Sequence, residues 1–92
     1  MTRDDAERLN VALLQIAGRL NETAAFVRDK ADAERWHQYR RAVGTVMADV
    51  FDLGEWLWGQ FPELKPEQVG GAYKLDPLIY DPPFYDVGGS EG

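Results

Sequence analysis

The sequence lacks cysteine, and this absence excludes a disulfide framework and a cysteine-ligated zinc site. It also lacks an apolar run long enough to cross a bilayer. Its first five residues are acidic on balance and no apolar stretch follows them, so we expect no signal peptide. Because small proteins without disulfides are typical of a reducing compartment, we expect a cytoplasmic protein.

Histidine is scarce as well, since His37 is the only one in the chain. With one histidine and no cysteine, the chain has almost no material for a Ser-His-Asp or Cys-His nucleophilic system. The pair Gly70-Gly71 is followed by Ala-Tyr-Lys, which is not the pattern of a phosphate-binding loop. We therefore predict that the protein is not an enzyme and needs no cofactor.

Basic residues are outnumbered by acidic ones, ten against sixteen, and the formal net charge is −6. Residues 62–92 carry two basic and six acidic side chains, and so acidic a segment repels phosphate backbones and anionic lipids. We therefore predict that the protein binds neither nucleic acid nor membranes. The alternative is a nucleic-acid-binding hairpin that uses Arg35, Arg40 and Arg41, although a solvated helix face also explains this basic cluster.

Proline is missing from residues 4–61, and the periodicity of this segment is that of a helix. Apolar residues recur at alternating steps of three and four. They form two seams, the first of Ala6, Leu9, Leu13, Ile16, Leu20, Thr23 and Val27, and the second of Trp36, Tyr39, Val43, Val46, Val50, Leu53 and Leu57.

The phase of the seams breaks between Val27 and Trp36, which predicts a turn near residues 29–32. Asp32 or Asp29 would cap the helix that follows the turn, and Pro62 would end that helix. The turn contains neither glycine nor proline, so one long bent helix is the alternative.

These patterns predict an all-α fold: a two-helix antiparallel hairpin over residues 1–61, followed by an extended Pro/Tyr-rich C-terminal tail over residues 62–92. We expect the tail to be disordered from Val87 onward. The apolar stripes are too wide for two helices to cover, so we predict that two hairpins pair into a homodimeric four-helix bundle. The competing arrangement is a tail that folds back on the hairpin as a third layer.

The tail contains two tandem copies of Asp-Pro-x-x-Tyr, in residues 76–80 and 81–85. Prolines pre-set an extended backbone, so such a segment loses little entropy when it docks on a surface. The second copy, Pro82-Pro83-Phe84-Tyr85, matches the Pro-Pro-x-Tyr pattern of WW-domain ligands. A strap that covers its own bundle and a segment that binds another protein both fit these residues.

Trp56 points away from the second seam by helical phase, so we expect the tail to pack over it on the second half of that helix. With the tail it completes the set of candidate partner-binding residues: Trp56, Tyr80, Pro82, Pro83, Phe84 and Tyr85.

Carboxylates supply two weaker signals. Glu34 and His37 share a helix face, and such a pair ligates metal in carboxylate four-helix bundles, although an incidental spacing on a surface helix explains the pair better. Asp49, Asp52 and Glu55 follow at three-residue steps and form an acidic ridge that would attract a basic partner.

The favoured function is a non-enzymatic protein–protein interaction or adaptor module. It would self-associate through its helices and use its tail or its acidic ridge for contact. The alternative is a metal-binding carboxylate bundle that uses Glu34 and His37.

Overall fold

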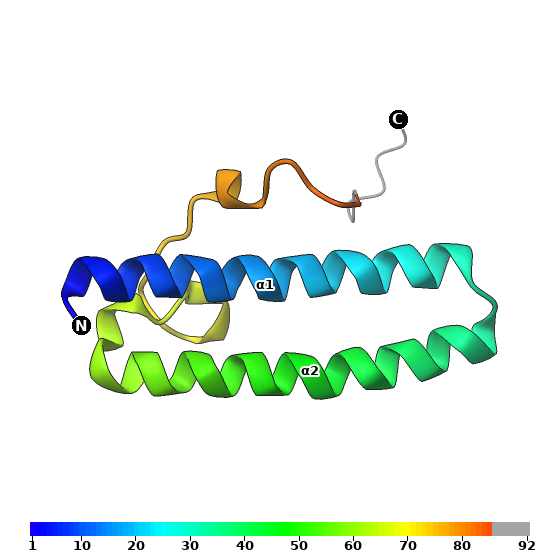
Figure 1. Ribbon diagram of the computed structural model, residues 1–92, viewed down its shortest axis with the longest axis horizontal. Helices are drawn as coiled ribbons and strands as arrows, with labels where there is room; N and C mark the ends of the chain where they lie inside the picture. Colours follow the sequence, from blue (N-terminus) through cyan, green and yellow to red (C-terminus); the bar gives the residue numbers. More distant parts are fainter. Residues whose placement is uncertain (86–92) are drawn as a thin grey trace.

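The computed structural model describes residues 1–85, and these residues form a helical hairpin followed by three short 3-10 helices. The two long helices are α1 (Arg3–Lys30) and α2 (Ala33–Gln60). The short ones are η1 (Pro62–Leu64), η2 (Glu67–Val69) and η3 (Pro77–Tyr80). Figure 1 shows α1 and α2 side by side and antiparallel, with the end of the described chain returning along the outer side of α1. The predicted all-α hairpin is confirmed, and the disorder predicted from Val87 lies outside the described residues.

The helix ends follow from local side-chain chemistry. Thr2 caps α1, because its hydroxyl oxygen accepts a hydrogen bond from the Asp5 N–H at 3.0 Å. Asp32 caps α2 in the same way, with its carboxylate 2.8 Å from the Arg35 nitrogen. Pro62 directly follows Phe61, the C-terminal cap residue of α2. The predicted turn, its cap and the proline stop are therefore confirmed.

The core lies at the end of the hairpin away from the turn. Its buried residues are Ala6, Leu57, Trp58 and Leu64, and three of them, Ala6, Leu57 and Leu64, are completely inaccessible to solvent. Leu64 belongs to η1, so residues beyond the predicted hairpin complete its core. Two helices alone leave a gap on one side, and the chain after α2 fills that gap.

The segment after α2 is held by its own backbone bonds. The Tyr73 N–H donates to the Lys65 carbonyl at 3.0 Å, and the Glu67 N–H donates to the Tyr73 carbonyl at 3.2 Å. Gly71 is required here, because a Cβ at this position would overlap the Lys65 carbonyl oxygen. The expectation of an extended tail is wrong for residues 77–80, which form η3 because Asp76 caps the Leu78 N–H at 2.9 Å.

The buried face of α1 is rotated from its predicted position. Ile16, in the predicted seam, is 48% exposed, whereas Asn10, Leu14 and Ala17 are buried. Ile16 therefore lies outside the core of the single chain. The reason is that the chain after α2 packs on another side of α1, where Leu14 and Gly18 lie.

None of the helices in residues 1–85 combines the length and the apolar character that a membrane crossing requires.

Candidate functional site

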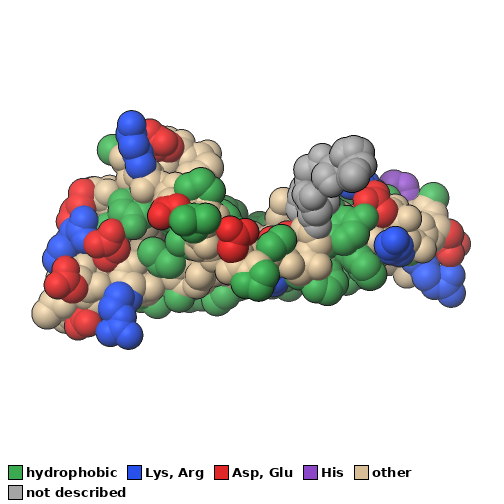
Figure 2. Space-filling model, turned by 90° about the horizontal axis from the view of Figure 1, so that it is seen from above, with side chains coloured by type: hydrophobic (Ala, Val, Ile, Leu, Met, Phe, Trp, Pro, Cys, Tyr) green, Lys and Arg blue, Asp and Glu red, His purple; other side chains and the backbone are tan. Residues whose placement is uncertain are grey.

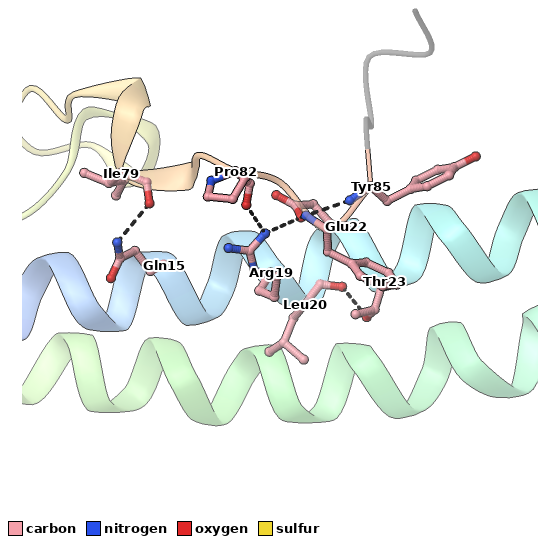
Figure 3. Close-up of polar contacts among 9 residues, drawn as sticks. Gln15, Arg19, Leu20, Glu22, Thr23, Ile79, Pro82 and Tyr85 are labelled. Atoms are coloured by element: carbon pink, nitrogen blue, oxygen red, sulfur yellow. Dashed lines mark hydrogen bonds and ion pairs between the residues drawn. The ribbon is translucent and has the colours of Figure 1, made fainter.

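Residues 77–85, which we call the strap, dock on α1 through backbone contacts. The Gln15 side-chain amide donates to the Ile79 carbonyl at 2.9 Å, and one turn later Arg19 donates to the Pro82 carbonyl at 3.2 Å. Figure 3 shows these side chains reaching from one side of α1 to the strap. Polar residues one helical turn apart thus recognise successive strap carbonyls.

Glu22 holds the last part of the strap. Its carboxylate is 8% exposed and accepts hydrogen bonds from the Phe84 N–H at 2.6 Å and the Tyr85 N–H at 3.4 Å (Figure 3). Arg19 pairs with the same oxygen at 2.8 Å. Burial raises the pKa of Glu22, but the bonds from Phe84, Arg19 and Tyr85 outweigh burial and the pKa is lowered. Glu22 is therefore a charged anchor for the strap at neutral pH.

Aromatic contacts complete the docking. The Phe26 ring lies 5.3 Å from that of Phe84 and 5.2 Å from that of Tyr85, measured between centroids. The Tyr85 hydroxyl donates to the Asp29 carboxylate at 2.7 Å. The hydrogen bond from Arg28 and, with a smaller effect, the bond from Tyr85 lower the pKa of Asp29. The centroid distances from the Phe26 ring to the Phe84 and Tyr85 rings are those of favourable tilted and edge-to-face aromatic pairs.

Tyr80 packs its ring on the backbone of α1 at Gly18. A Cβ at position 18 would overlap the Cδ1 and Cε1 carbons of that ring, so only glycine permits this approach. Burial raises the pKa of the Tyr80 hydroxyl. Beside the ring is a hollow of about 230 Å³ between the two helices and η2. It is lined by Leu14, Ala17, Gly18, Asn21, Met47, Phe51, Pro66, Gln68, Val69 and Tyr80.

Most predicted partner-binding residues therefore meet on α1 of their own chain. Tyr80, Pro82, Phe84 and Tyr85 all contact it, whereas Pro83 is exposed in the strap.

The expectation that the tail covers Trp56 is wrong. η1 packs at the end of α2, but Trp56 remains 59% exposed and the strap lies on α1 (Figure 1). The physical reason is that α1 offers the strap two features. The missing side chain of Gly18 makes room for the Tyr80 ring, and the buried carboxylate of Glu22 accepts hydrogen bonds from the strap backbone. The exposed tryptophan offers neither of these.

In residues 1–85 the Glu34–His37 pair has no third metal-ligating side chain beside it. Residues 1–85 contain no group of three or more His, Cys, Asp or Glu side chains able to hold a metal. Glu34 and His37 are both exposed, and the His37 Nδ1 lies 3.4 Å from an Arg40 nitrogen.

The acidic ridge also lies in solvent, since Asp49, Asp52 and Glu55 are all exposed. Its only charged contact among the described residues joins Glu55 to Lys65 at 3.8 Å.

A second surface, which we call the open face, combines the exposed parts of the two seams. Its large exposed residues are Ile16 (48%), Val46 (45%) and Leu53 (56%). The seam residues Leu9, Leu20, Val27, Tyr39, Val43 and Val50 are partly buried.

Both helices contribute to the open face on the same side of the hairpin. Val27 and Tyr39 line one shallow groove between α1 and α2 near the turn. Ile16 precedes Val27 by about three helical turns, and Val46 follows Tyr39 by about two, so each shares the side of its neighbour. Ile16 is about 200° around α1 from Gly18, where Tyr80 packs, and about 60° from Arg19, so the strap borders this side without covering Ile16.

The sequence reasoning missed Asn10 and Arg19 and assigned Glu22 no part in docking the strap. Asn10 could have been found, because it is a polar residue on an otherwise apolar side of α1 between Ala6 and Leu14. Glu22 and Arg19 carry no such signal, since their role depends on where the strap returns. Comparison of the chain with family models, with curated proteins and with solved structures finds no match.

Proposed function

We propose that the protein is a non-enzymatic protein–protein interaction module whose open face binds a second copy of the chain to form a homodimeric four-helix bundle. The observation that carries this proposal is the exposure of Ile16, Val46 and Leu53 on one side of a hairpin whose other side is covered by its own chain. A second pair of helices is the cover that such a face fits.

The energetics favour pairing. Full burial of a branched aliphatic side chain contributes about 1.5–3 kcal/mol, and each copy offers three such side chains with partly buried neighbours. The strap already occupies the outer side of α1, and its contacts leave the open face free. Self-association therefore competes with no intramolecular cover among the described residues.

The acidic ridge and the outward strap side chains provide the second contact of this proposed module. Leu78 is 68% exposed and Phe84 is 54% exposed, although the strap backbone is fixed on α1. These side chains are presented on an ordered backbone, which reduces the entropy lost when a protein partner binds.

Sedimentation equilibrium of the full chain and of Leu53→Glu tests the self-association. We expect the wild-type chain to be dimeric at micromolar concentration. Leu53→Glu should weaken association by about a hundredfold or more, because each dimer would bury two unpaired carboxylates.

The matched control is Leu78→Glu, since Leu78 is equally large and more exposed but lies on the strap. It should sediment as the wild type does. A monomeric wild-type chain, or equal association of Leu53→Glu and wild type, would contradict the proposed dimer.

A further inference from the structure

We infer that two copies pair head to tail, with α2 of one copy against α2 of the other and the two turns at opposite ends of the bundle. The two-fold axis would pass close to Val46 and Ile16. This inference rests on the proposed self-association and adds its orientation and register.

Only two arrangements stack two such faces around a two-fold axis with all neighbouring helices antiparallel. In the head-to-tail arrangement the axis crosses both helices, so α1 meets α1 and α2 meets α2. In the other arrangement the axis runs along the helices, α1 meets α2, and the two turns lie together. Both cover the same apolar area, so burial alone does not choose between them.

Charge decides between the two arrangements. Residues 33–46 of α2 contain three arginines and one glutamate, whereas residues 47–60 contain three carboxylates and no basic residue. α1 has the same polarity: residues 17–30 hold three basic and two acidic side chains, and residues 3–16 hold two basic and three acidic ones. Figure 2 shows basic and acidic side chains together toward each end of the molecule, so the polarity is one of net charge.

The head-to-tail arrangement places the basic turn end of one copy against the acidic end of the other. The alternative places like charges together at both ends, and such juxtaposition disfavours a complex. The polarity of α2 is strong enough to matter, because its two halves differ from +2 to −3.

The register follows from three observations that agree. Tyr39, Val46 and Leu53 are spaced by seven residues, so Val46 is the centre of the apolar line on α2. Along the helix, the midpoint between Arg41 and Asp52 also falls beside Val46, and both charges lie on the outer side of α2, about 120–140° around the helix from Val46.

The third observation comes from the hairpin itself. The Tyr39 hydroxyl donates to the Thr23 hydroxyl oxygen at 2.9 Å, which fixes these two residues at one level. Seven residues farther from the turn on each helix stand Ile16 and Val46. Both exposed centres thus lie at the same height, where a single axis would bring each to its own symmetry mate.

Engineered cysteines test this geometry directly, because the native chain contains none. Disulfides need Cα atoms about 4–7 Å apart. Under mild oxidation we expect Val46→Cys and Ile16→Cys each to form a covalent dimer with itself. Leu53→Cys is the control, since it lies on the same face but about 10 Å from the axis, so the two copies of this cysteine would be about 20 Å apart.

The rival arrangement gives the opposite pattern. Val46→Cys and Ile16→Cys would then fail to cross-link alone and would cross-link when mixed. That pattern, or equal cross-linking of Val46→Cys and Leu53→Cys, would overturn the head-to-tail arrangement.

Charge reversal supplies an independent readout. Arg41→Glu should weaken the dimer at low salt, because it removes positive charge from the turn end, which faces the acidic end of the other copy. Adding Asp52→Lys to the same chain should restore association. No weakening by Arg41→Glu, or no recovery in the double variant, would overturn the orientation.

Salt gives a further test on the unmodified chain. Added salt should weaken a head-to-tail dimer and would tighten a dimer with like charges together, so tightening would overturn the orientation. These results separate two failures. A monomeric wild-type chain refutes self-association itself, whereas a dimer with the wrong cross-links refutes only its arrangement.

Discussion

At the scale of single residues, Asn10 joins three segments of the chain. It is completely inaccessible to solvent, and its side-chain nitrogen donates to the Leu64 carbonyl at 2.9 Å. Its side-chain oxygen accepts from the Trp58 indole N–H at 2.8 Å. No buried side-chain nitrogen or oxygen in residues 1–85 is left without a partner, and Asn10 is one reason for this. A polar residue in an apolar core here specifies which segments meet.

Asn10→Ala removes both bonds at once. The Trp58 N–H and the Leu64 carbonyl would then stay buried without partners, and we expect the free energy of unfolding to fall by about 2–4 kcal/mol. Urea unfolding at one fixed protein concentration, followed by circular dichroism, measures the change. Asn21→Ala, an exposed site on the same helix, should change stability by less than about 0.5 kcal/mol. Similar losses in the two variants would show that Asn10 is not a structural hub.

At the scale of elements, the first and last residues of the helices could be predicted from the sequence better than the side of each helix that is buried. Helix ends depend on neighbours along the chain, so Thr2, Asp32 and Pro62 are readable as caps and stops. The buried side of a helix depends on what packs against it. Leu14 and Gly18 are outside the predicted seam of α1 and lie toward the strap side, whereas Ile16 of the predicted seam stays exposed.

The docking of the strap is the part of the candidate site that the sequence could not give. The tandem Asp-Pro-x-x-Tyr motif predicts a segment that docks on a surface, but it does not indicate which surface binds the segment. That choice depends on long-range contacts, of which the bond from Phe84 to Glu22 spans sixty-two residues. The motif could therefore predict a docking segment but not its receptor.

Strap docking should depend on pH through Glu22. Its pKa is lower in the docked state than the ordinary value of 4.5, so docked Glu22 is ionised more readily than released Glu22. Its contribution to docking is then fully present above about pH 4.5 and is lost as the pH falls through the lowered pKa. We expect the protection of the Phe84 amide, measured relative to its intrinsic exchange rate at each pH, to fall over that range.

Two variants separate Glu22 from its neighbour Asp29, whose pKa is also lowered. Glu22→Gln should loosen the strap already at neutral pH and remove most of the acid dependence. Asp29→Asn should leave the effect at Phe84 in place. An unchanged pH profile in Glu22→Gln would exclude Glu22 as the acid-sensitive anchor.

At the scale of the whole molecule, the two sides of the hairpin differ in how they are covered. Residues 62–73 and the strap cover one side and the outer edge of α1, and the open face lies on the other side. The width of the apolar stripes predicted that two helices would not hide them. The structure divides this surplus between an intramolecular cover and a face that we propose a second copy covers.

The two parts of the C-terminal segment should differ in their importance for folding. A chain that ends at residue 75 lacks the strap, whose side chains Leu78 and Phe84 are largely exposed, and we expect it to keep its helices and its dimer. A chain that ends at residue 61 also lacks Leu64, which is fully buried against Ala6 and Leu57. Since losing one such leucine costs about 2–5 kcal/mol, the shorter chain should be largely unfolded.

Circular dichroism and sedimentation of the two truncated chains measure this difference. Leu64→Ala in the full chain is the matched variant, because it removes the buried side chain without shortening the chain, and it should lower the free energy of unfolding by about 2–5 kcal/mol. The folding unit would then extend beyond the helical hairpin to about residue 73, where Tyr73 bonds to Glu7 at 2.7 Å. If the chain ending at residue 61 proved as helical and as stable as the full chain, two helices and a partner copy would suffice, and η1 would have no role in the fold.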